Sequence, residues 1–192
     1  MATKRIAVLT GSRSEYDLLR SLLRAINEHP DLTLQLFVTG CHLGPSFGDL
    51  LSDVEADGFE VRRRIPLAIE AGNAVEEACY VTDAMAKIAC NLAIDEPDML
   101  LIYGHSPVAL AGAAAAVMCR VVLVHYSPLN TDGRWLQEKL RPAIVGLADM
   151  HITPSKALAA VYEMRRQGAP IHCGDLSKPD AGKEIAEILA DA

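Results

Sequence analysis

The sequence predicts an α/β fold, with one doubly wound parallel sheet and helices on both of its faces. Short runs of valine, leucine and isoleucine alternate with longer helical stretches along the whole chain. Parallel strands need long crossover connections, and these helices supply them. Hydrophobic residues make up 51% of the chain and aromatic residues only 5%, which is typical of strands buried on both faces. A single domain over residues 1–192 suits this length.

The first strand is expected at residues 6–10, where a continuous apolar run ends at Gly11. A helix over residues 17–28 follows, because its leucines and its isoleucine recur at helical spacing and fall on one face. The next apolar run, residues 32–39, ends at Gly40 and predicts a second strand. These elements form the first strand, helix, strand unit of the sheet.

A weaker third strand is expected at residues 59–63, followed by a loop at residues 71–73. A long helix over residues 74–94 stops before Pro97, since the residue before proline disfavours helical geometry. The second half of the chain continues the alternation, with an alanine-rich helix at its centre. The expected strands there are residues 99–103, 121–125, 150–153 and 171–173, and the expected helices are residues 108–119, 135–148, 156–167 and 181–190.

Charge and cysteine content exclude several classes of partner. The formal net charge is -7, so we expect no nucleic-acid partner, and the basic residues 62–64 are expected to be solvated surface. Five scattered cysteines without a CxxC pair indicate a reduced, cytoplasmic protein, and those within helices are assigned to packing. The longest uncharged apolar run, residues 106–119, is too short to span a bilayer, so no membrane association is expected.

The loops that follow the strands are expected to hold the functional site, because parallel strands end at one edge of the sheet and ligands bind there. The first of these loops indicates an anion-binding turn. Gly11 allows a sharp turn, Ser12 or Ser14 caps the next helix, and Arg13 adds a charged donor. The alternative is a plain connection with a solvated arginine. The turn is neither a GxGxxG motif nor a P-loop.

Several segments resemble the N-terminal half of the hydrolysing UDP-N-acetylglucosamine 2-epimerases of sialic acid and related pathways. The residues that carry the resemblance are Thr10-Gly11-Ser12-Arg13-Ser14-Glu15-Tyr16-Asp17-Leu18-Leu19, Val38-Thr39-Gly40-Cys41-His42-Leu43, Phe47-Gly48, and residues 55–60 and 96–101. The resemblance implies a Rossmann-like domain that forms one lobe of a GT-B fold. It also implies a nucleotide sugar, or another phosphorylated small molecule, bound between two lobes.

In that family the second lobe makes most of the nucleotide contacts, and the resemblance does not extend to it. A complete cleft would therefore need a complementary GT-B lobe from a partner chain or from a homodimer. No cofactor and no metal are implied. The resemblance and the loops together give the predicted substrate-binding residues, which are Gly11, Ser12, Arg13, Glu15, His42, Gly104, Ser106, Ser127 and Arg141.

The acid/base positions of the family depart from its pattern. Where the family has a Gly-Asp-Arg turn, this chain has Gly104-His105-Ser106, and where its His-x-His-Gly-Gly-Glu run ends in glutamate, it has Asn130. Gln137 stands near a further acidic position. Amides cannot accept a proton at neutral pH, so these changes put ordinary epimerase or hydrolase turnover in doubt. His105, His125 and Asn130 are the positions to which catalysis would be assigned.

Three functions stay open at this point. The chain is an epimerase-like lobe that binds an anionic ligand, a non-catalytic subunit that completes a cleft with a partner chain, or an enzyme with new chemistry on His105 and His125. A serine hydrolase using Ser127 lacks a recognisable nucleophile elbow. A metal site on His42, His105 and His125 is conceivable but lacks ligand spacing. His29, His151 and His172 are assigned structural roles.

Overall fold

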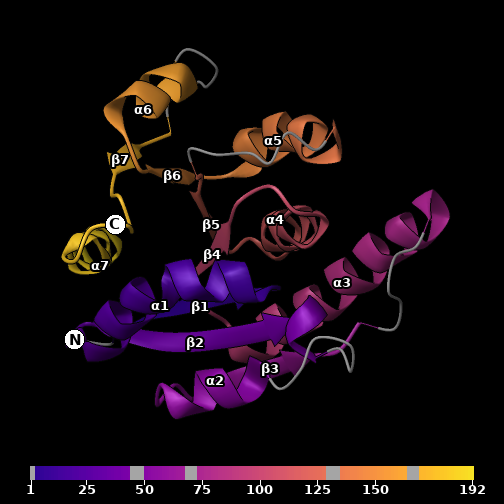
Figure 1. Cartoon of the computed structure of the whole chain (residues 1–192), viewed down its shortest axis with the longest axis horizontal. Helices are drawn as coiled ribbons and strands as arrows, with labels where there is room; N and C mark the ends of the chain where they lie inside the picture. The colour runs from indigo at the N-terminus through magenta and orange to yellow at the C-terminus, as the bar shows by residue number, and fades with distance from the viewer. Residues whose placement is uncertain (1–2, 44–49, 68–72, 129–134, 164–168) are drawn as a thin grey trace.

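The chain folds around one seven-stranded, all-parallel sheet, as the sequence predicts. The structure is a computed structural model that describes residues 3–43, 50–67, 73–128, 135–163 and 169–192. The strand order is β3-β2-β1-β4-β5-β6-β7, so the first strand lies near the middle of the sheet (Figure 1). The strands are β1 (Lys4–Thr10), β2 (Leu32–Thr39), β3 (Val61–Ile65), β4 (Met99–Tyr103), β5 (Val122–Tyr126), β6 (Met150–Thr153) and β7 (Ile171–Cys173).

Helices cover both faces of the sheet, and each face has its own buried cluster. Helices α1, α2 and α7 pack on one face, and α3, α4 and α5 pack on the other (Figure 1). The helices are α1 (Arg13–Glu28), α2 (Leu50–Ala56), α3 (Ala74–Asp95), α4 (Pro107–Cys119), α5 (Trp135–Leu147), α6 (Lys156–Glu163) and α7 (Ala181–Asp191), and a 3-10 helix η1 spans Gly40–Leu43.

Two glycines let helices approach their neighbours closely. A Cβ atom on Gly112 of α4 would lie 2.7 Å from the Leu9 side chain of β1. One on Gly182 of α7 would lie 2.5 Å from the carbonyl oxygen of Ser21 in α1. The alanine-rich composition of α4 therefore reflects close packing on the sheet.

Most predicted elements are confirmed to within a few residues, and three differ for physical reasons. Helix α1 begins at Arg13, because Ser12 caps it. Strand β3 begins two residues after the expected start, and its pairing with β2 is irregular between Leu36 and Phe37. Helix α2 and the short η1 were not expected. Helix α2 has only seven residues, too few for a periodic signal.

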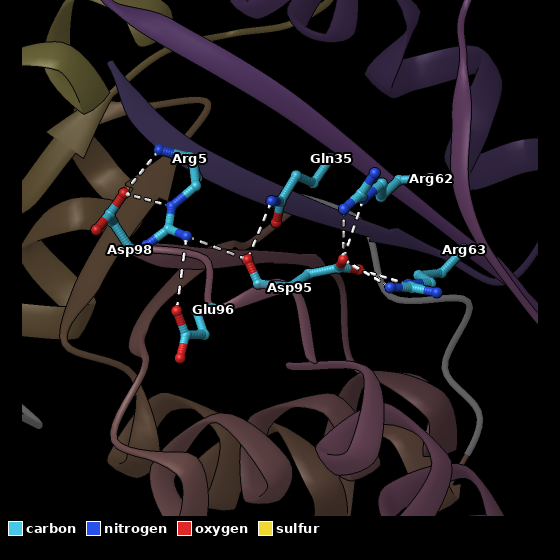
Figure 2. A network of polar contacts seen from close by, with 7 residues as sticks. All are labelled: Arg5, Gln35, Arg62, Arg63, Asp95, Glu96 and Asp98. Atoms are coloured by element: carbon cyan, nitrogen blue, oxygen red, sulfur yellow. Dashed lines mark hydrogen bonds and ion pairs between the residues drawn. The ribbon is translucent and has the colours of Figure 1, made fainter. Parts of the chain in front are cut away.

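At the edge where the strands begin, which we call the amino edge, Asp95 forms the centre of a charged network (Figure 2). Its carboxylate accepts hydrogen bonds from Arg63 at 2.6 and 2.7 Å and from the Nε of Arg62 at 3.0 Å. Its backbone carbonyl accepts from Gln35 and Arg5. The Arg63 and Arg62 guanidinium groups hold the pKa of Asp95 below its usual value.

The expectation that residues 62–64 form a solvated surface was therefore wrong. Arg62 and Arg63 pair with Asp95, whose side chain is fully buried, and Arg64 pairs with Glu55 at 2.6 Å. A run of arginines on a strand reaches different neighbours because successive side chains point to opposite faces.

The cysteine assignments need one correction. Cys79 and Cys90 of α3 are exposed, because Ala84, Ile88 and Leu92 form the line that faces the sheet. Cys119 is partly buried and lies 3.7 Å from the Ala89 carbonyl oxygen. Among the helices of the described residues, none combines the length and the apolar character that crossing a bilayer requires.

Candidate functional site

The candidate site lies at the edge where the strands end, which we call the carboxyl edge, between β1 and β4. These two strands are direct neighbours, although β1 also pairs with β2 and β4 with β5. The chain therefore winds outward in both directions from this point. In open α/β sheets, ligands bind outside the strand ends at such a switch point. The turns that follow β1 and β4 begin at Gly11 and Gly104, both named by the sequence.

The turn after β1 is closed by a reciprocal pair of caps. The Ser12 hydroxyl accepts a hydrogen bond from the backbone N–H of Glu15 at 3.4 Å. The Glu15 carboxylate in return accepts from the backbone N–H of Gly11 at 2.8 Å. This is the capping-box arrangement of a helix start. The N–H groups that were expected to meet an anion at Gly11 are thus engaged by a carboxylate of the chain itself.

Glu15 also joins this turn to the turn after β4, because its carboxylate hydrogen-bonds with the Ser106 side chain. Ser106 caps α4, and its hydroxyl accepts from the Ala109 N–H at 3.1 Å. Burial raises the pKa of Glu15 to about 7, although hydrogen bonds from Gly11, Ser12 and Ser106 favour its ionised form. The carboxyl edge therefore contains a carboxyl group that exchanges protons near neutral pH.

Gly40, at the end of β2, lies against the same turn. Its φ is +60°, and a Cβ atom there would lie 2.7 Å from the Gly11 carbonyl oxygen and 3.0 Å from the Tyr80 hydroxyl. Any other residue would be strained in this conformation and would collide with backbone. The turns after β1, β2 and β4 therefore meet at one place on the carboxyl edge.

The two predicted arginines are arranged differently. Arg13 is exposed and pairs with Asp53 at 3.0 Å. Arg141 of α5 is more buried, with 23% of its side chain exposed, and its Nη2 donates to Glu138 at 3.2 Å. The charge of Arg141 acts on His105 and His125, since it lowers the pKa of both. Of the two, Arg141 lies nearer to the histidines of the edge.

Three buried histidines form a row beneath the edge, which we call the imidazole row: His105, His125 and His151. The exposed fraction is 4% for His105 and 0% for the other two. The ring centroids lie 5.2 Å apart between His105 and His125, and 5.4 Å apart between His125 and His151. His105 Nε2 also lies 3.3 Å from the hydroxyl of Ser127, which is fully buried.

Burial keeps these imidazoles neutral. It lowers the pKa of His105 to about 4, with a smaller contribution from the Arg141 guanidinium, and lowers the pKa of His125 well below its ordinary value. Neutral imidazoles can donate and accept hydrogen bonds but are weak bases when the pKa is low. The arrangement therefore suits ligand binding and orientation better than proton removal by His105 or His125.

The structure brings together most of the predicted residues, but two lie beyond its reach. The side chain of His42 and the whole of Asn130 fall outside the described residues. Within the described residues, no group of three or more histidine, cysteine or acidic side chains could hold a metal ion.

His151 is the residue that sequence reasoning missed, since it was assigned a structural role alone. The signal that could have identified it is register. His125 and His151 are direct partners on neighbouring parallel strands, and each interrupts an otherwise apolar run that the sequence predicts to be buried.

Comparison with known proteins gives relatives of one kind. The sequence pattern of the family described as UDP-N-acetylglucosamine 2-epimerase matches residues 24–172. A UDP-N-acetylglucosamine 2-epimerase of Neisseria meningitidis serogroup B is 28% identical over 185 residues, which cover 92% of this chain and 46% of that protein. A hydrolysing UDP-N,N'-diacetylbacillosamine 2-epimerase of Legionella pneumophila is 27% identical over 154 residues, which cover 80% of this chain and 41% of that protein.

Solved structures have the same fold. The N. meningitidis UDP-GlcNAc 2-epimerase bound to UDP-GlcNAc superimposes with a TM-score of 0.77 at 18% identity, over 96% of this chain and 50% of that chain. A co-structure of S. aureus MnaA with UDP gives a TM-score of 0.78 at 21% identity, over 94% of this chain and 47% of that chain.

This chain thus spans about half the length of the relatives that it matches. The predicted fold, a doubly wound parallel sheet like one lobe of these epimerases, is confirmed. Because the family pattern covers well over half of its residues, the chain belongs to the UDP-N-acetylglucosamine 2-epimerase family.

Proposed function

We propose that this chain binds a nucleotide sugar of the UDP-N-acetylglucosamine type at its carboxyl edge, as one lobe of an epimerase-like cleft. The observation that carries the proposal is the junction of β1 and β4, where Glu15 links the Gly11 turn to Ser106. Ligands of open α/β sheets bind at this switch point. Relatives with this fold are described as bound to UDP-GlcNAc and to UDP.

The residues at the junction suggest which part of the ligand they meet. Backbone groups of Gly104 and the hydroxyl of Ser106 are suited to sugar hydroxyls and to an acetamido group. The Arg141 guanidinium, which is only partly exposed, is suited to a phosphate oxygen. Neutral His105 adds a further hydrogen-bonding partner without a charge.

We expect binding without ordinary turnover, because His105 and Asn130 stand where the family pattern has carboxylic acids. Isothermal titration calorimetry with UDP-GlcNAc and UDP tests the binding, and detection of released UDP and N-acetylmannosamine tests the turnover. Arg141→Ala should weaken binding about tenfold, whereas Arg64→Ala, at an exposed ion pair with Glu55, should leave it unchanged. Absence of any binding would contradict the proposal, and brisk sugar release would contradict the loss of turnover.

A second candidate is a subunit that completes its cleft with another lobe. It is favoured by one observation: the chain covers 46% and 41% of the two relatives above. Size-exclusion chromatography with light scattering would distinguish a homodimer from a monomer. Co-purification of a separate UDP-binding lobe would favour the heteromeric arrangement, and tight UDP-GlcNAc binding by a pure monomer would contradict it.

A further inference from the structure

The imidazole row contains enough hydrogen bonds to fix where its protons lie. The Nε2 atom of His125 is 3.0 Å from the carbonyl oxygen of Gly104, and its Nδ1 is 3.3 Å from the Nδ1 of His151. A carbonyl oxygen can only accept, so His125 carries a hydrogen on Nε2. In a neutral ring the Nδ1 is then an acceptor. His151 must therefore donate from its own Nδ1.

The neutral state of His125 follows from the same geometry. A second hydrogen on His125 would face the Nδ1 hydrogen of His151, so protonation would break this contact. His105, His151 and Arg141 also face His125 and oppose a positive charge on its ring, and burial lowers its pKa further. One arrangement of hydrogens thus satisfies both rings.

This arrangement holds the Gly104 turn from below. Gly104 has a φ of +71°, and its N–H donates to the Tyr126 carbonyl oxygen at 2.9 Å. Its own carbonyl accepts from His125. Both polar backbone groups of Gly104 are therefore held by β5, and the residues that follow, His105 and Ser106, start from a fixed point.

We propose that His151, acting through His125, is a positioning residue that fixes the Gly104 turn and thereby places His105 and Ser106 for the ligand. The inference rests on the proposed function for its ligand, but the geometry of the turn can be tested without one. His151 is a residue of the β6 strand and belongs to none of the predicted binding positions, so its role is indirect.

The first test is the proton pattern itself, read from nitrogen-15 chemical shifts of labelled histidines in the wild-type protein. The pattern expected at neutral pH is Nε2–H for His125 and Nδ1–H for His151, each as a single neutral tautomer. A hydrogen on Nδ1 of His125, or a ring that titrates with an ordinary histidine pKa, would overturn the inference. This test needs no variant and no ligand.

The second test uses paired variants. His151→Asn keeps an N–H donor near the position of Nδ1, whereas His151→Leu removes it; His172→Leu on β7, outside the row, is the matched control. We expect His151→Leu to move the amide resonances of Gly104 to Ser106, to mix the His125 tautomers and to weaken UDP-GlcNAc binding by roughly fivefold or more. His151→Asn and the control should preserve all three.

The outcomes separate the two proposals. If wild-type protein binds no UDP-GlcNAc, the proposed function fails, while the tautomers and amide resonances still decide the role of His151. If His151→Leu leaves the His125 tautomer and the turn resonances unchanged, the positioning role is wrong. If His151→Leu does not fold, His151→Asn decides: a changed turn there contradicts the inference as well.

Discussion

At the amino edge Asp95 is buried with two arginines, whereas at the carboxyl edge Glu15 and His105 are buried among neutral partners. The pKa values respond in opposite ways. Arginine hydrogen bonds lower the pKa of Asp95, while desolvation raises the pKa of Glu15 to about 7 and lowers that of His105 to about 4. Burial with a counter-charge preserves a charge, and burial without one removes it.

The comparison separates stability from function within one sheet. The amino edge uses its charges in fixed pairs, which hold the end of α3 against β1 and β3. The carboxyl edge keeps groups that can change protonation near physiological pH, which is typical of functional sites. Each of the following tests measures one side of this difference.

The largest effect is expected from Asp95→Asn. The variant loses the carboxylate that Arg62 and Arg63 share, so unfolding free energy should fall by about 3 kcal/mol. Urea denaturation measures it, with Asp98→Asn as the control, because Asp98 makes a half-exposed pair with Arg5. Equal losses in both variants would show that burial of the network does not matter.

Acid should destabilise the carboxyl edge. The pKa of His105 is about 4 in the folded state and about 6.5 in the unfolded chain, so the unfolded state binds more protons between these values. Stability therefore falls as the pH drops from 6.5 to 4, by on the order of 2 kcal/mol. Urea unfolding at several pH values should show a shallower fall in His105→Asn. An unchanged slope would contradict the assignment.

Glu15 should act in the opposite direction. Its folded pKa of about 7 exceeds the unfolded value of about 4.3, so the folded state binds more protons between them. Its contribution to stability is therefore full below pH 4 and is lost as the pH rises to 7, by on the order of 1 kcal/mol. Glu15→Gln should remove this component, and Glu55→Gln, exposed beside Arg64, should not.

The smallest effect is expected from exposed ion pairs. Arg64→Ala at the Glu55 pair and Arg13→Ala at the Asp53 pair should each change unfolding free energy by less than about 1 kcal/mol. Thermal denaturation at low and at high salt measures both. A loss as large as that in Asp95→Asn would erase the distinction between buried and exposed pairs.

The sequence predicted the site's backbone better than its electrostatics. Gly11, Gly40 and Gly104 were identified because glycine after a buried strand marks a turn, and all three lie at the carboxyl edge. The Ser12 cap and the ligand edge follow from similarly local rules. The link from Glu15 to Ser106, the pairing of Arg62 and Arg63 with Asp95, and the partnership of His125 with His151 depend on strand order and register. Residues far apart in sequence meet there, and no local pattern records it.

The position of β1 has a consequence for how the chain acquires its structure. This strand appears first during synthesis but lies between β2 and β4, so one of its sides stays open until Met99–Tyr103 has emerged. The residues of the Asp95 network all lie between Arg5 and Asp98, so that edge can close by then. The row of histidines has to wait for residue 151. We expect the scaffold to set early on the ribosome, and the ligand edge to be finished late.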